Sequence, residues 1–162
     1  MKTIIKSLTF SLIAFLFLLT SCSKKDEVVL DPADQVVGTY NGTSYSETTN
    51  GVTQTYDLTS ATFKDNVTIK LLVTRQTANT VKLDLTISQK DSAGSTQTST
   101  DSLENVELVA LSTGGFQLQN DSQTLGQVVN GVMTIAQTFP DTDSQGNAIQ
   151  VTVKIVSQKA SN

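Results

Sequence analysis

The 162-residue sequence contains no histidine and no tryptophan, and its only cysteine is Cys22. Histidine is the commonest general base near neutral pH, so its absence removes the usual serine and cysteine triads. Zinc and related metals also lose their preferred ligands. A lone cysteine cannot form an intrachain disulfide. These absences predict that the protein is not an enzyme and has no catalytic residues, no metal site and no bound cofactor.

Carboxylate chemistry is the remaining way to build a hydrolase, and the acidic residues do not favour it. Such enzymes need two carboxylates facing one site, whereas Asp84 and Asp101 fall in polar strand phases and no pair is placed inside a cavity. Residues 141–147 begin like a calcium loop, with acids two apart and a glycine at the sixth place. The fifth place has no acid, and Thr152 stands where a closing glutamate belongs. We therefore interpret this segment as a hairpin loop.

The charge balance of the chain is acidic. The net charge is −4, and it becomes −6 without residues 1–21, which carry two lysines and no acids. An acidic surface repels the phosphates of nucleic acids and anionic lipid headgroups. We expect no nucleic acid partner.

The first 22 residues have the pattern of an export signal. Lys2 and Lys6 precede an apolar run over residues 8–19, and small residues lead to Cys22 in Leu19-Thr20-Ser21-Cys22. The run is shorter than the roughly 20 residues that span a bilayer. The pattern resembles a bacterial lipoprotein signal, which implies that residues 1–21 are removed. It also implies that Cys22 carries diacylglycerol and an N-acyl chain such as palmitate, so that the membrane is a partner through this anchor.

Residues 22–35 follow as the lipidated cysteine and a flexible polar tether. Ser23 stands where an aspartate would retain a lipoprotein in the inner membrane. The Lys-Asp-Glu of residues 25–27 resembles the short charged signals that direct lipoproteins of Bacteroidota to the cell surface. We expect a lipid-anchored outer-membrane protein, with a cell-surface position favoured over one facing the periplasm.

From Val36 onward the sequence is typical of β-strands. In Val81 to Ser88 every odd position is apolar and every even position is polar, which predicts one buried and one solvated face. Asn50-Gly51 and Asn130-Gly131 are preferred two-residue hairpin turns. The sequence predicts eight strands, near residues 36–48, 52–58, 66–75, 80–89, 96–109, 115–120, 132–139 and 148–157.

Residues 120–131 are open to two interpretations. Leu125, Val128 and Val129 have helical spacing, but the two valines can also pair with Val132 and Met133 across the Asn-Gly turn as a short extra strand. Eight strands with short connections predict an all-β fold over residues 36–162, an antiparallel up-and-down barrel, with a two-sheet sandwich as the alternative. A closed barrel has no exposed strand edges, and this favours the barrel over the sandwich.

The segment Val37-Gly38-Thr39-Tyr40-Asn41-Gly42-Thr43 resembles the opening of calycin-like, or lipocalin-like, barrel domains found in Bacteroidota lipoproteins. Gly38 and Tyr40 match the glycine and the aromatic, usually tryptophan, of the lipocalin opening motif. The resemblance implies an eight-stranded barrel whose first aromatic packs across the closed end. Tyrosine replaces tryptophan, and no later lipocalin motif is matched, so no ligand-binding residue is carried over.

Aromatic residues are few, and by alternation four of them fall on apolar faces: Tyr40, Tyr56, Phe116 and Phe139. They either fill the barrel or line a small apolar cavity, and they are our candidate ligand-binding residues. Sugar-binding surfaces usually need an exposed aromatic ring for stacking, and Tyr45 is the ring that could serve in this way. The leading hypothesis is a lipid-anchored envelope barrel that binds a small apolar or amphipathic molecule. The alternative is a structural or interaction subunit that binds an envelope protein through its outer face or a strand edge.

Overall fold

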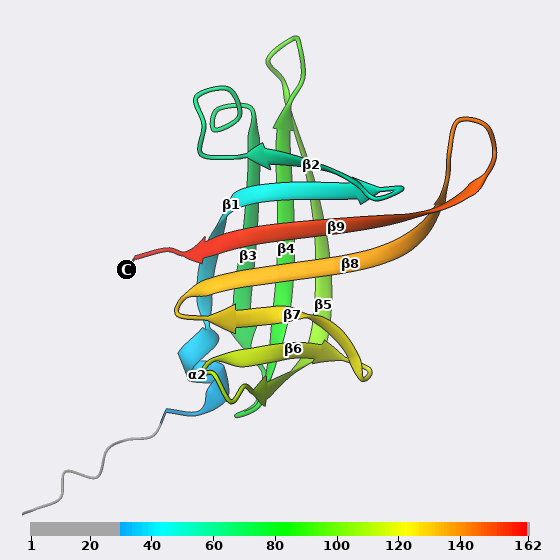
Figure 1. Ribbon diagram of the computed structural model, residues 1–162. Coiled ribbons are helices and arrows are strands. Elements are labelled where there is room, and N and C mark those ends of the chain that lie inside the picture. Colours follow the sequence, from blue (N-terminus) through cyan, green and yellow to red (C-terminus); the bar gives the residue numbers. More distant parts are fainter. Residues whose placement is uncertain (1–29, 162) are drawn as a thin grey trace, which may run out of the picture.

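The computed structural model describes residues 30–161, and within them it forms one short helix and nine strands (Figure 1). Residues 1–29, with the predicted signal and Cys22, lie outside the described part. The elements in chain order are α2 (Pro32–Val36), β1 (Gly38–Thr49), β2 (Val52–Asp57), β3 (Val67–Arg75), β4 (Thr80–Lys90), β5 (Thr96–Ala110), β6 (Phe116–Asn120), β7 (Gln123–Val129), β8 (Val132–Thr142) and β9 (Ala148–Lys159).

The strands close into a barrel. From β3 to β9 each strand pairs antiparallel with the next one in the chain, and β1 pairs with both β3 and β9. The ring therefore contains eight strands, β1 and β3 to β9, as the predicted all-β antiparallel barrel requires. In Figure 1 the long strands β3, β4 and β5 run from top to bottom, and β1 and β6 to β9 cross them.

The set of barrel strands differs from the prediction in one member. The predicted strand at 52–58 is β2, which pairs only with the outer half of β1 and stays outside the ring. Its place is taken by β7, because Val128 and Val129 pair with Met133 and Val132 across the Asn130-Gly131 turn. The interpretation of this segment as an extra strand is confirmed, and the helical alternative is wrong.

Alternation along the strands builds the core. Apolar side chains of successive strands point into the barrel, and the least exposed large ones, together with Val36 of α2, are Tyr40, Leu71, Val73, Val81, Val106, Leu118 and Met133. Most of these residues lie in the half of the barrel that contains the end of β3 and the start of β4. This half is filled by its own side chains.

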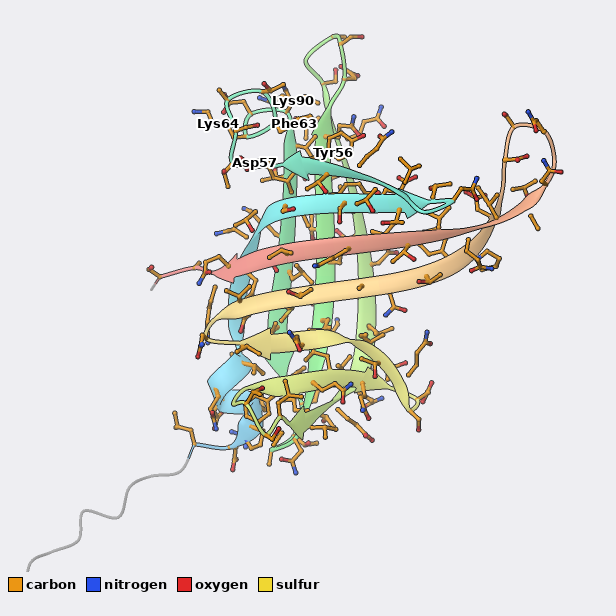
Figure 2. All side chains as sticks on the ribbon, viewed as in Figure 1. Tyr56, Asp57, Phe63, Lys64 and Lys90 are labelled. Carbon is orange, nitrogen blue, oxygen red and sulfur yellow. The ribbon has the colours of Figure 1, made fainter. Side chains whose placement is uncertain are left out.

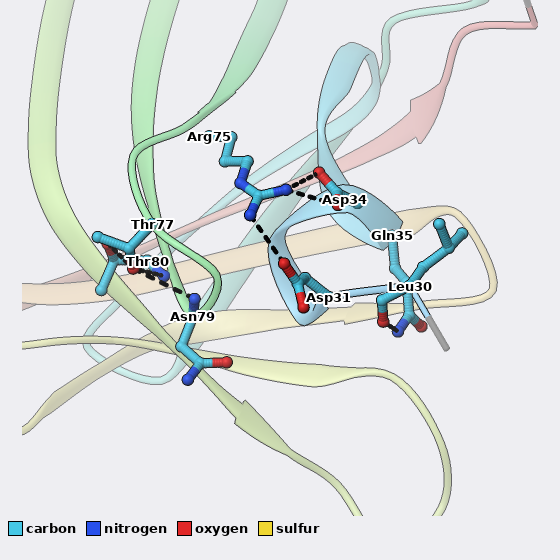
Figure 3. A network of polar contacts seen from close by, with 8 residues as sticks. All are labelled: Leu30, Asp31, Asp34, Gln35, Arg75, Thr77, Asn79 and Thr80. Carbon is cyan, nitrogen blue, oxygen red and sulfur yellow. Dashed lines mark hydrogen bonds and ion pairs between the residues drawn. The ribbon is translucent and has the colours of Figure 1, made fainter. Parts of the chain in front are cut away.

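Helix α2 covers that end of the barrel, which we call the closed end. Ala33 and Val36, three residues apart, are both buried in the core. The Arg75 guanidinium at the end of β3 binds Asp34 through both carboxylate oxygens at 2.6 Å and Asp31 at 2.7 Å (Figure 3). The helix is thus held by buried apolar contacts and by partly exposed ion pairs.

This helix corrects the predicted boundary at residue 36. We interpreted residues up to 35 as flexible tether because they are polar and contain Pro32, but proline is well suited to the first turn of a helix. The folded part therefore begins no later than Pro32.

Candidate ligand-binding cleft

A cleft of about 400 Å³ opens at the end of the barrel opposite α2, which we call the open end. It exists because β1 changes partner along its length: residues 38–41 pair with β3, whereas residues 44–49 pair with β2. The change occurs at a register shift between Gly42 and Ser44. A side chain at Gly42 would place its Cβ 2.8 Å from the Cβ of Ile69, so glycine allows β1 to cross β3 closely.

Beyond this crossing the β1–β2 hairpin separates from β3 and β4, and the space between them is the cleft. Its wall is mostly apolar, with four aliphatic side chains: Leu58, Val67, Ile69 and Ile87. Leu58 is itself buried, and its backbone N–H donates to the carbonyl of Thr43 at 3.0 Å, which fixes the end of β2 against the crossing.

Three aromatic rings form the rest of the apolar wall. Tyr45 and Tyr56 are cross-strand partners on β1 and β2, with ring centroids 6.0 Å apart. Phe63, from the loop between β2 and β3, meets Tyr56 edge to face at 5.5 Å. Figure 2 shows Tyr56 and Phe63 close together at the end of the barrel away from α2. The three rings connect the hairpin to the loop that follows it.

Polar groups are few and lie among these rings. The Tyr45 hydroxyl donates to Glu47 at 3.4 Å, and the Tyr56 hydroxyl donates to Gln54 at 2.8 Å. Burial, and secondarily the Glu47 carboxylate, raises the pKa of Tyr45 above its usual value of 10.0. The phenol therefore stays protonated near neutral pH and acts as a donor. Gln89 completes the polar lining.

The four predicted ligand-binding residues are not brought together. Tyr56 lines the cleft. Tyr40 is fully buried, and its hydroxyl donates to the carbonyl of Val36 at 2.7 Å, at the closed end. Phe116 is a core residue of β6, and Phe139 on β8 is 42% exposed. Neither of them lines the cleft.

Sequence reasoning did not select Tyr45, Glu47, Leu58 or Phe63 for this site. Alternation from Tyr40 places Tyr45 on the opposite face of β1, but the register shift after Gly42 reverses the phase and turns both tyrosines inward. A glycine inside an otherwise regular strand is the signal for such a bulge. Phe63 lies in a loop, where no strand period applies.

The loop over residues 143–147 connects β8 and β9, so the hairpin interpretation of this segment is confirmed. The Asp143 carboxylate accepts the backbone N–H groups of Gln145 and Asn147, both at 2.8 Å. Bonds from Asn147, first from its side chain, lower the pKa of Asp143. Over residues 30–161 the structure has no cluster of three or more potential metal-ligating His, Cys, Asp or Glu side chains.

Comparison with protein families, with curated proteins and with solved structures gives no significant match for this chain. A search of the described residues for a helix long and apolar enough to cross a membrane also finds none. The cleft is therefore interpreted from its own geometry.

Proposed function

We propose that this protein is a non-enzymatic, lipid-anchored barrel of the cell envelope that binds a small apolar or amphipathic molecule in the cleft at its open end. The observation that carries the proposal is the contrast between the two halves of the barrel. The closed half is filled by its own side chains, whereas the open half leaves a cleft of about 400 Å³ with an apolar and aromatic wall. That volume lies within the range of small-molecule sites.

The lining has the composition expected for such a ligand. Aliphatic side chains and the three rings offer surface to an apolar body, and the phenol hydroxyls with Glu47 and Gln89 offer hydrogen bonds to a polar end. The lipid anchor and the outer-membrane location rest on the sequence around Cys22. The absence of histidine and of a second cysteine supports a non-catalytic role.

The test begins with protein purified from its host, followed by native mass spectrometry and extraction of bound lipid. We expect a bound small molecule at close to one per chain. Tyr56→Ala removes a ring from the cleft on a strand outside the barrel closure, so it should release the molecule without unfolding the protein. Phe139→Ala, a partly exposed aromatic away from the cleft, is the matched control. Wild-type protein that carries no ligand and binds none from an envelope lipid extract would refute the proposal.

A second candidate function, partner binding through a strand edge, is favoured by β2. In the part of the chain that the structure describes, β2 pairs with β1 along one edge and with no strand along the other. An open edge is a template for an extended segment of another protein. Leu72 on the outer face is 46% exposed, but its cross-strand neighbours Thr39 and Asp84 are polar.

Pull-down from solubilised envelope followed by hydrogen exchange tests this second function. A partner that adds a strand to β2 is recovered in stoichiometric amount and slows exchange of the β2 amides. A protein recovered alone, with β2 exchange unchanged in the envelope extract, would exclude the edge as a binding site.

A further inference from the structure

The strand pairing identifies the charged side chains on the inner faces of the barrel. Cross-strand partners in an antiparallel pair share a face, so pairing with a buried residue identifies an inward position. Arg75 pairs with Val81, and Lys159 pairs with Tyr40, both at the closed end. These two cations already have partners there, because Arg75 binds two aspartates and Lys159 donates to the carbonyl of Gln35 at 3.1 Å.

Glu47 and Asp101 are acidic residues at inward positions. Glu47 is the one charged residue among the nine that line the cleft. Asp101, which we expected on a polar outer phase, pairs with Leu85 and so lies on the inner side of β5. Leu85 packs against the core next to Ile87 of the cleft wall. Leu85 pairs with Leu71, the partner of Tyr40, so Asp101 lies in the same cross-strand row as Lys159, and the acid of the cleft is Glu47.

The remaining strand lysines are on outer faces. Lys70, Lys82 and Lys90 alternate with the buried or cleft-lining residues of β3 and β4, and Lys154 does so on β9. Lys64 and Lys90 line a separate polar cavity of about 270 Å³ on the outer side of β3 and β4, with Thr68 and Ser88. Figure 2 shows these two lysines at the open end, near Phe63. Lys64 and Lys90 are therefore not part of the cleft lining and do not offset the charge of Glu47 there.

The Glu47 carboxylate has no cationic partner in the described chain: every ion pair over residues 30–161 involves another acid. Its two hydrogen-bond donors, the hydroxyls of Tyr45 and Thr49, are neutral and lie at 3.4 and 3.3 Å. Neutral donors leave the negative charge in place. Tyr45 and Tyr56 add ring faces, which attract cations through their quadrupoles.

We propose that the ligand of this cleft is an amphipathic amine, with an apolar body against Leu58, Val67 and Ile69 and an ammonium group at Glu47. This inference rests on the proposed binding function and specifies its ligand class. Glu47 supplies the ion pair, and the tyrosine rings beside it supply a cation–π surface. An anionic amphiphile of the same length would place its charge next to the Glu47 carboxylate.

The experiment compares decylamine, decan-1-ol and decanoate, each below its critical micelle concentration, by calorimetric titration of the full chain. The three probes share the apolar chain and differ in the charge of the head group. We expect decylamine to bind about three- to tenfold more tightly than decan-1-ol, the range of an exposed ion pair with a cation–π contribution. Decanoate should bind more weakly than decan-1-ol, and added salt should reduce the differences.

Glu47→Gln should remove most of the preference for decylamine and leave the affinity for decan-1-ol unchanged. Glu107→Gln is the matched control, since Glu107 alternates with buried residues of β5 and points outward. Equal affinities for the three probes, or a preference for decanoate, would overturn the amine inference while leaving the binding function intact. Binding of none of the three would overturn the proposed function itself.

Discussion

The hydroxyl of Tyr40 on β1 donates a 2.7 Å hydrogen bond to the carbonyl oxygen of Val36, the last residue of α2. Tyr40 has no exposed surface, and Val36 is 2% exposed. This bond joins the covering helix to the first strand inside the core.

Replacing Tyr40 with phenylalanine should therefore weaken the closed end. The ring still fills its space, but the Val36 carbonyl loses a donor in a buried site, at a cost of about 1–3 kcal/mol in the free energy of unfolding. Chemical denaturation of the wild type and Tyr40→Phe measures the difference. Tyr56→Phe, which removes a more exposed hydroxyl, should cost less than half as much.

The same hydroxyl should make the protein sensitive to alkali. Burial raises the pKa of Tyr40 from 10.0 to about 12. Above pH 10 the unfolded chain loses this proton while the native state keeps it, so the free energy of unfolding falls as pH rises from 10 towards 12. The stabilisation is fully present below pH 10. Denaturation between about pH 8 and pH 11 should show a smaller decline for Tyr40→Phe than for the wild type.

Removal of the Arg75 side chain should loosen α2 without unfolding the barrel. Both ion pairs of Arg75 are exposed to solvent, so Arg75→Ala should change global stability only slightly. The local effect is larger: the Ala33 N–H, which donates to the carbonyl of Ala78 at 3.0 Å, should exchange with solvent several-fold faster. Lys70→Ala, on the outer face of β3, is the control. Unchanged exchange at Ala33 would show that the helix is held by its apolar contacts alone.

Two adjacent glycines in the β5–β6 connection should respond differently to alanine. Gly114 and Gly115 have similar positive φ angles, 88° and 85°, so both substitutions impose the same backbone strain. A Cβ at Gly114 meets no atom within 4 Å, whereas one at Gly115 would overlap the carbonyl oxygen of Val128 on β7. We expect Gly114→Ala to cost about 1 kcal/mol and Gly115→Ala at least about 2 kcal/mol more. Thermal denaturation of the two variants isolates the steric effect.

Local patterns predicted most of the strands. The alternation around Leu83 predicted a strand over 80–89, and β4 is Thr80–Lys90. Asn50 and Asn130 have positive φ angles of 51°, as their predicted hairpin turns require. These predictions succeed because strand period and turn chemistry depend on neighbouring residues.

Which strands form the barrel and which residues line the cleft is decided by contacts between residues far apart in the chain. Local sequence patterns therefore did not predict either set. Whether β2 or β7 belongs to the ring is decided by the pairing of β1 with β3 and β9. Tyr45 faces the cleft only because the bulge after Gly42 reverses the phase of β1. Tyr56 was predicted on an apolar face and does line the apolar cleft, but its neighbours Phe63 and Glu47 come from a loop and a shifted strand.

The pairing of β1 with β9 sets the order of folding events. Tyr45 and Ile155 are cross-strand partners although about 110 residues separate them in the chain. Contacts between such distant residues form late and slow the folding of a small domain, because a long loop must close first. Until β9 has paired with them, β1 and β8 keep open edges that can pair with other chains. We therefore expect the pairing of the twelve-residue strand Ala148–Lys159 to limit both the folding rate and the resistance to aggregation of a newly synthesised chain.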